Sequence, residues 1–308
     1  MNILVTGGAG FIGSKICDVY LKKGHNVIIL DNMSNSSGEF INNDCKFYKN
    51  DIYSDDIEYI FKENKIDVIN HQAAQIDLRD SIFNPVKDLR INVEGSLNLL
   101  QLSVKYNIKK FIFASSGGAA YGEQLQFPAS ESHRIQPLSP YGISKITIEK
   151  YLFFFKSYYN IDYIILRYAN VYGERQGNSG EGGVVSVFMK NIINNKTSFI
   201  NGDGTNTRDY VYVRDVADAN LKALKYTESD VFNVSTGSET STNLLAKHII
   251  KVTETKSEFV HRESVKGEQK RSCLDNSKAK RILDWIPQYN LEDGLKITYD
   301  WFKSYNVK

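Results

Sequence analysis

Metal-binding and membrane-spanning patterns are the first features that the sequence lacks. It has three cysteines in 308 residues, far apart and in no CxxC pair, which excludes a disulfide framework and a cysteine zinc site. Its five histidines show no metal-ligand spacing. No run approaches about 18 apolar residues, so no transmembrane helix is expected. We therefore expect a cytoplasmic protein that binds no metal ion.

An excess of charge of one sign is also lacking. The 38 lysines and arginines nearly balance the 36 aspartates and glutamates, and a net charge of +2 creates no field that would attract nucleic acid or an anionic membrane. We therefore expect neither as a partner. With 42% hydrophobic and 24% charged residues the composition is globular, and the length suggests about two domains.

Short apolar segments alternate with longer helical patterns in the first half of the chain. Expected strands cover residues 3–6, 27–30, 46–50, 68–71, 111–115 and 164–167, and expected helices cover 11–23, 55–64, 93–106 and 141–159. This alternation predicts an α/β fold with a doubly wound parallel sheet between two layers of helices. The pattern weakens after residue 167. We expect a nucleotide-binding domain over 1–169 and a smaller α/β lobe over 170–308, and we leave open whether a strand and helix within 210–235 rejoin the first sheet.

A glycine-rich turn follows the first expected strand. Gly7, Gly10 and Gly13 permit a tight turn, let backbone N–H groups approach a pyrophosphate, and open a helix whose N-terminus favours anions. Asp31 ends the second strand, where a carboxylate can accept both ribose hydroxyls of an adenosine and would repel a 2′-phosphate, which favours NAD over NADP. Asp51, after the third strand, is either a partner of the adenine amino group or an ordinary turn aspartate.

The motif Tyr141-x-x-x-Lys145 follows Pro140, which suits a helix start, so the two side chains fall one turn apart on one face. A free tyrosine has a pKa near 10, and a nearby lysine together with the positive ring of oxidised nicotinamide can lower that pKa. Ser115 and Ser116 follow the fifth strand, at the sheet edge where ligands bind. Either one can hydrogen-bond a reacting hydroxyl, or both are turn serines that satisfy local backbone groups.

Together these motifs resemble the extended short-chain dehydrogenase/reductase family, and within it the UDP-glucose 4-epimerase-like sugar-nucleotide enzymes. Further matching segments are 71–75, 92–95, 166–173, 207–211 and 274–279, so the resemblance runs from end to end. It implies a Rossmann domain with a C-terminal sugar-nucleotide lobe, NAD as the cofactor, a UDP-sugar as the substrate, and a homodimer built on helices over 93–106 and 141–159.

The resemblance also implies roles position by position. Tyr141 would be the base for the sugar 4-hydroxyl, Lys145 would hold the nicotinamide ribose and lower the tyrosine pKa, and Ser116 would bind the substrate hydroxyl. The implied cofactor residues are Gly7, Gly10, Phe11 and Ile12 at the pyrophosphate, Asp31 and Asn32 at the ribose, Asp51 and Ile52 at the adenine, and Gln72 and Asn92 nearby. The implied substrate residues are Asn170 and Arg208 at the diphosphate and Ser272 beside C2 of the sugar.

Two positions depart from the family pattern. Gly117 stands where the catalytic serine or threonine often lies, so we infer a one-residue insertion and favour Ser116, with Ser115 in reserve. Val265 stands where many relatives carry an arginine, which leaves either Arg262 or Arg271 as the second cation for the diphosphate.

The leading hypothesis for function is epimerisation at C4 of a UDP-hexose, by transient oxidation to a 4-keto sugar. Alternatives within the family are a uronate epimerase, a decarboxylase or a 4,6-dehydratase; Gly117-Gly118 replaces the Asp-Glu pair of the dehydratases. A catalytically silent NAD-binding regulator is disfavoured because the Tyr141 and Lys145 pair is intact. Ser272 is small, which predicts room for an N-acetyl group, unless it is merely a strand residue near the pocket.

Overall fold

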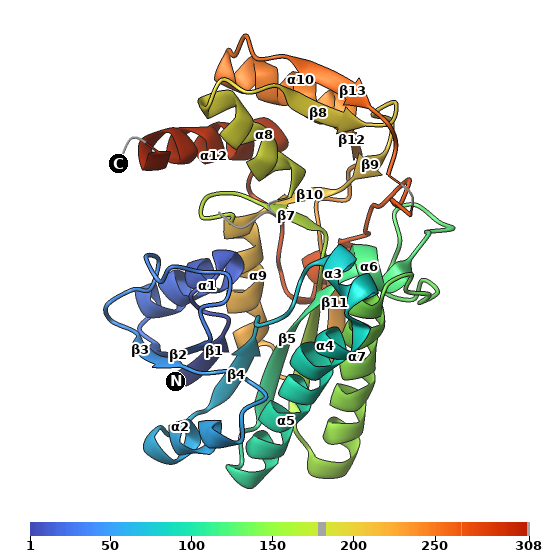
Figure 1. Ribbon diagram of the computed structural model, residues 1–308. Coiled ribbons are helices and arrows are strands. Elements are labelled where there is room, and N and C mark those ends of the chain that lie inside the picture. The colour runs from blue at the N-terminus through green and yellow to red at the C-terminus, as the bar shows by residue number, and fades with distance from the viewer. Residues whose placement is uncertain (178–182, 266, 307–308) are drawn as a thin grey trace.

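The computed structural model describes residues 1–177, 183–265 and 267–306. Its central feature is a sheet of seven parallel strands in the spatial order β11-β6-β5-β4-β1-β2-β3 (Figure 1). The strands are β1 (Asn2–Thr6), β2 (Asn26–Asp31), β3 (Lys46–Lys49), β4 (Val68–His71), β5 (Lys110–Ser116), β6 (Asp162–Tyr168) and β11 (Asp230–Val234). The order reverses between β1 and β4, which confirms the predicted doubly wound fold.

Helices cover both faces of this sheet because its strands are apolar on both sides, as in Ile3, Leu4 and Val5, which are fully buried. On one face lie α1 (Phe11–Lys22), α9 (Val213–Lys225) and α11 (Ser277–Ile282). On the other lie the 3-10 turn η1 (Asp55–Ile57), α2 (Glu58–Glu63), α5 (Gly95–Lys105) and α7 (Pro140–Tyr159). The chain thus returns to the first sheet late in the sequence: α9 packs against α1, and β11 pairs with β6.

One helix begins earlier than the sequence predicts. The expected helix over 93–106 is preceded by α3 (Leu78–Phe83), α4 (Pro85–Leu89) and a π-helical turn, η2 (Arg90–Glu94), which leads directly into α5. Pro85 occupies the first position of α4, where its missing N–H is no loss. The π-helical turn contains Asn92, whose side chain exchanges two hydrogen bonds with the backbone of Gln75 and so ties the helix to the loop after β4.

The C-terminal lobe has a core of its own, around residues such as Phe188, Met189, Tyr212 and Leu245. Its helices are α8 (Val184–Ile193), α10 (Thr242–Thr253) and α12 (Leu291–Asn306). Its short strands form three pairs: β7 (Asn170–Tyr172) with β10 (Tyr210–Tyr212), β9 (Thr207–Arg208) with β12 (Thr240–Ser241), and β8 (Ser198–Asn201) with β13 (Phe259–Arg262). A functional division near residue 169 stays a prediction. None of the helices in the described ranges has the length and apolar character needed to cross a membrane.

The glycine turn at the end of β1 sets how closely α1 approaches the sheet. A Cβ atom at Gly13 would stand 2.1 Å from the carbonyl oxygen of Gly7, whereas one at Gly10 would stand 3.3 Å from the same oxygen. We therefore expect Gly13→Ala to lower the free energy of unfolding by about 1–3 kcal/mol through overpacking. Urea unfolding followed by circular dichroism measures the change. Gly10→Ala is the matched control, and an equal loss in both variants would contradict this account.

Candidate active site

The glycine turn exposes backbone donors at the edge where the strands end. Gly7 has a φ of +68°, a left-handed conformation that favours glycine, and a Cβ there would stand 2.7 Å from the backbone nitrogen of Ala73. Helix α1 begins after Gly10, and in the described chain no side chain caps it and no acidic residue lies in its first turn. The N–H groups of Phe11 and Ile12 are therefore available to an anion, and the close-packed turn fits a pyrophosphate.

Asp31 lies beside this turn, at the end of β2. One carboxylate oxygen accepts a hydrogen bond from the Ala9 N–H at 3.0 Å, and the other accepts one from the Met33 N–H at 2.8 Å. Each oxygen keeps a second acceptor position, which is what two ribose hydroxyls require. Burial raises the pKa of this carboxyl group above its ordinary value, against the lowering effect of the two backbone bonds.

The other predicted adenosine residues come together next to Asp31. The Asn32 side chain donates a hydrogen bond of 2.5 Å to Asp51, and Ile52 is buried beside Gly95, where a Cβ would stand 2.5 Å from the Ile52 side chain. The loops after β2 and β3 thus form one surface. This surface offers a carboxylate, an amide and an apolar side chain to a purine nucleoside.

Tyr141 and Lys145 project from the first turns of α7, next to the end of β5. Lys145 is only 4% exposed, and its ammonium group donates a hydrogen bond of 2.9 Å to the Ala114 carbonyl. The Lys145 nitrogen lies 5.6 Å from the centre of the Tyr141 ring and 4.9 Å from that of Phe113. Gly142 brings the short helix α6 (Gly117–Tyr121) against α7, since a Cβ there would stand 2.5 Å from the carbonyl oxygen of Ala119. The pair is thereby fixed at the carboxyl edge of the sheet.

The two candidate serines differ in how they are bound. Ser115 is buried, and its hydroxyl donates a hydrogen bond of 2.6 Å to Glu149 on α7. Glu149 also forms a buried ion pair with Arg167, with a shortest contact of 2.5 Å. Ser116 is half-buried and caps α6 by accepting a hydrogen bond from the Ala119 N–H at 3.4 Å. Of the two, Ser116 keeps its hydroxyl proton free for a substrate oxygen.

The pKa values of the pair differ from the simple expectation that a lysine lowers that of a nearby tyrosine. Burial raises the pKa of Tyr141 above its ordinary value, and the negative charge of Asp88 raises it further. Burial lowers the pKa of Lys145 to about 8, although the carboxylates of Asp88 and Glu149 oppose this. In the protein alone burial therefore outweighs the lysine, and a phenolate at Tyr141 needs an additional positive charge.

Gln72 and Asn92 use their side chains within the protein. The Asn92 amide bonds to the Gln75 backbone and to Asp88, and the Gln72 amide bonds to Asn70 and accepts from Tyr168. The backbone of residue 72 lies against the glycine turn, within 3.0 Å of a Cβ placed at Gly7. The backbone of residue 72 thus lines the glycine turn, and the side-chain amides of both predicted cofactor residues are already engaged within the protein.

Side chains of the C-terminal lobe face the serine segment. The backbone nitrogen of Ser272 donates a hydrogen bond of 3.2 Å to Thr207, and the Ser272 hydroxyl oxygen would lie 3.5 Å from a Cβ at Gly118. Asn170 is exposed at the start of β7, and Arg208 is half-buried in β9. Position 272 therefore lies beside the expected reaction centre, and position 208 next to it on the lobe.

The two arginines that the sequence leaves open lie in different surroundings. Arg271 forms a two-fold contact with Glu239, at 3.0 and 2.6 Å, and Glu239 also accepts a hydrogen bond from Thr207, the neighbour of Arg208. Arg262 lies on β13, where it bonds to Asn201. Only Arg271 therefore shares the neighbourhood of Arg208.

Three acidic residues of this region carry no sequence signal strong enough to be predicted. Asp88 and Glu239 belong to no motif, and Glu149 is distinguished only by its place one turn after Lys145. Each is brought to the site by a contact between distant parts of the chain. Among the described residues no group of three His, Cys, Asp or Glu side chains is arranged to hold a metal ion.

Comparison with known proteins gives a consistent set of relatives. The chain is 38% identical to a UDP-glucose 4-epimerase of Mycolicibacterium smegmatis over 310 residues, which cover 99% of both chains. The crystal structure of UDP-glucose 4-epimerase from Thermotoga maritima with UDP-glucose shares 44% identity, covers all of both chains, and superposes with a TM-score of 0.98. A UDP-N-acetylglucosamine 4-epimerase from Methanobrevibacter ruminantium, in complex with UDP-N-acetylmuramic acid, shares 35% identity with a TM-score of 0.94, covering 99% of this chain and 98% of that one.

The family model gives the same assignment from the sequence alone. Residues 3–235 match the NAD dependent epimerase/dehydratase family, a span that includes the glycine turn, the serine segment and the Tyr141 and Lys145 pair. This span and the full-length relatives together confirm the resemblance found in the sequence. The chain belongs to the NAD dependent epimerase/dehydratase family.

Proposed function

We propose that this protein is an NAD-dependent 4-epimerase of UDP-hexoses, acting on the UDP-glucose and UDP-galactose pair and on the N-acetylated pair. The observation that carries the proposal is that Lys145, with Tyr141 one turn before it on α7, and Ser116 lie at the end of β5, on the same carboxyl edge of the sheet as the glycine turn after β1. Full-length relatives that carry the name UDP-glucose 4-epimerase support it.

Two surfaces of the protein would bind NAD, one its pyrophosphate and the other its adenosine. The N–H groups of Phe11 and Ile12, with the turn at Gly7 and Gly10, hold the pyrophosphate. Asp31 accepts the ribose hydroxyls, and the surface made by Asn32, Asp51 and Ile52 receives the adenine. When bound, NAD supplies a hydride acceptor and, at the nicotinamide ring, the positive charge that Tyr141 needs.

Tyr141 is the group that transfers the proton to and from the sugar 4-hydroxyl. Its phenolate takes the proton of the sugar 4-hydroxyl as C4 is oxidised, and the resulting phenol returns a proton when the 4-keto sugar is reduced on its other face. Lys145 keeps its ammonium group beside the ring and favours the phenolate. Ser116 donates its hydroxyl proton to the same substrate oxygen and keeps it oriented toward Tyr141.

The substrate's diphosphate is assigned to the C-terminal lobe. Asn170 and Arg208 are the binding groups implied by the family pattern, and the shared contact through Glu239 favours Arg271 over Arg262 as the second cation. Arg271 would exchange one anionic partner for another, which lets it move without losing its charge compensation. The small side chain of Ser272 leaves room on the C2 side of the sugar.

Exposed apolar side chains support a homodimer. Phe153, Phe154 and Tyr158 are exposed on α7, and Phe83 and Val86 are exposed on the neighbouring helices α3 and α4. We propose that α7 and the helix over residues 93–106 pair with the same helices of a second copy of the chain, as the family resemblance implies, and that this helix bundle covers exposed apolar side chains of α7 and its neighbours. The unpaired cysteines fit a cytoplasmic location.

We expect the purified protein to convert UDP-galactose to UDP-glucose and back, and Tyr141→Phe to lower turnover about 10²–10⁴-fold, the usual contribution of a positioned general base. Chromatography of the nucleotide sugars measures both directions. NAD released on denaturation should be the same in both proteins, because the tyrosine hydroxyl is small beside the whole cofactor surface. A wild-type protein that interconverts no UDP-sugar would overturn the proposed function, and full activity of the variant would remove Tyr141 from the mechanism.

We expect Ser272→Tyr to abolish turnover of UDP-N-acetylglucosamine selectively, by filling the space on the C2 side, while UDP-galactose conversion is mostly retained. The specificity ratio kcat/KM for the two sugars is the quantity to compare. Ser272→Ala is the matched control, since it removes the hydroxyl without filling the space, and it should accept both sugars. Equal loss of both activities in the tyrosine variant means that position 272 supports the fold and does not select the substrate.

A further inference from the structure

A second carboxylate, that of Asp88, is buried against α7, the helix that carries Tyr141 and Lys145. Asp88 is on α4, a helix that packs on α7, and its side chain has no exposed surface. One oxygen accepts a hydrogen bond of 2.6 Å from the hydroxyl of Ser144, the residue before Lys145. The other accepts one of 2.9 Å from the amide of Asn92 in the π-helical turn.

The two carboxylates that act on Lys145 are compensated differently. Glu149 is paired with the Arg167 guanidinium through two of its nitrogens, so its charge is largely neutralised at close range. The two hydrogen bonds to Asp88 in the described chain come from a neutral hydroxyl and a neutral amide. A buried carboxylate held only by neutral donors projects its charge onto its surroundings with little screening.

We propose that Asp88 is a positioning residue of the active site: its buried carboxylate, hydrogen-bonded to Ser144 on α7, supplies a fixed negative charge that acts on Tyr141 and Lys145. This inference rests on the proposed function, because it deepens the account of the same acid and base. The hydrogen bonds from α7 and from the π-helical turn hold the carboxylate at one place beside the pair. An electrostatic role would explain why the fold buries the Asp88 carboxylate, which within the described residues forms its hydrogen bonds with Ser144 and Asn92 and not with Tyr141 or Lys145.

The direction of the effect follows from Coulomb's law. The negative charge of Asp88 raises the pKa of Tyr141, because it disfavours the phenolate, and raises the pKa of Lys145, because it favours the ammonium. His71 on β4 also faces Lys145; burial and the lysine charge lower its pKa to about 3, so it stays neutral. Removing the Asp88 charge should therefore lower both proton affinities together.

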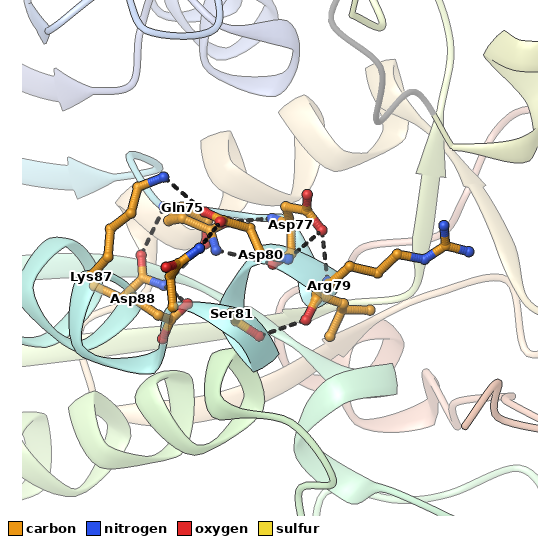
Figure 2. Close-up of polar contacts among 10 residues, drawn as sticks. Gln75, Asp77, Arg79, Asp80, Ser81, Lys87 and Asp88 are labelled. Carbon is orange, nitrogen blue, oxygen red and sulfur yellow. Dashed lines mark hydrogen bonds and ion pairs between the residues drawn. The ribbon is translucent and has the colours of Figure 1, made fainter. Parts of the chain in front are cut away.

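The surroundings offer a matched control. Burial raises the pKa of Asp88, the bonds from Ser144 and Asn92 and the charge of Lys145 oppose this, and the charge of Asp80 on α3 raises it slightly further. The Asp80 carboxylate itself accepts a hydrogen bond of 2.8 Å from the exposed Lys87. Figure 2 shows both aspartates, with Lys87 reaching Asp80 and Arg79 extending away from the group. Asp80→Asn changes the net charge by the same amount as Asp88→Asn, in the same segment, but removes a carboxylate that is already paired with a cation at the surface.

The direct test is a titration of Tyr141 that needs neither sugar nor turnover. Phenolate absorbance of the purified protein, cofactor included, is recorded against pH, and the curve of the same protein carrying Tyr141→Phe is subtracted. We expect the midpoint to lie at lower pH in Asp88→Asn than in the wild type, and to be unchanged in Asp80→Asn. Ser144→Ala keeps the carboxylate but removes one of its two hydrogen bonds, so we expect a midpoint shift clearly smaller than that in Asp88→Asn.

Turnover gives a second readout. Both limbs of the pH profile of kcat/KM should move to lower pH in Asp88→Asn, because the acid limb reports the phenolate and the alkaline limb the ammonium. Each pH unit of displacement changes the rate on a limb about tenfold. A merely structural role would lower the rate and leave both limbs in place. Asp88→Ser provides a second neutral variant if the asparagine protein does not fold.

An unchanged Tyr141 midpoint in a folded neutral variant overturns the proposal. So does a shift in Ser144→Ala as large as that in Asp88→Asn, because the hydrogen bond and not the charge would then be responsible. Neither result bears on the proposed function. That function fails separately, if the wild-type protein interconverts no UDP-sugar while its Tyr141 still titrates as expected.

Discussion

The buried ammonium group of Lys145 is the constraint on which the candidate active site depends. Its hydrogen bond to the Ala114 carbonyl ties α7 to β5, and the close approach of Gly142 to Ala119 packs the start of α7 against α6. Burying a lysine lowers its pKa, so the fold must supply negative charge if the group is to stay ionised. The acidic residues behind the site follow from this need.

Two carboxylates meet that need in different ways. Glu149 lies on the same helix and is held by Arg167 and Ser115, which makes it part of a closed ion-pair network between α7, β5 and β6. Asp88 comes from another helix and is held by neutral groups. The Glu149 charge, which Arg167 balances, ties α7 to β6. The Asp88 charge, held by neutral donors, is the one proposed to act on Tyr141 and Lys145. Burial, and the charge of Asp88 with it, raises the pKa of Tyr141. As the proposed base, Tyr141 therefore needs a bound positive charge in order to ionise.

The segment of the C-terminal lobe around Ser272 is joined to this centre by backbone and by side-chain contacts, such as the hydrogen bond from the Cys273 N–H to the Gln124 side chain. Backbone hydrogen bonds join the segment around Ser272 to Thr207. Two residues after Ser272, Leu274 pairs with Ala129 in the loop before α7. Since Glu239 bridges Arg271 and Thr207, the residues proposed to bind the diphosphate are already held together by contacts within the lobe.

The sequence by itself determined the sheet, the glycine turn and the Tyr141 and Lys145 pair, because each depends on residues close together in the chain: apolar strands, glycines at fixed spacing, and two side chains one helical turn apart. Tertiary structure decided the rest. The π-helical turn at Asn92 exists because a loop 17 residues away binds its side chain. The burial of Asp88 and the bond that engages Ser115 with Glu149, which supports the preference for Ser116 taken from the sequence, rest on contacts between separate helices and strands that no local pattern encodes. Proton affinities depend on burial and on the charges that distant segments bring near, so only the folded chain could fix their direction.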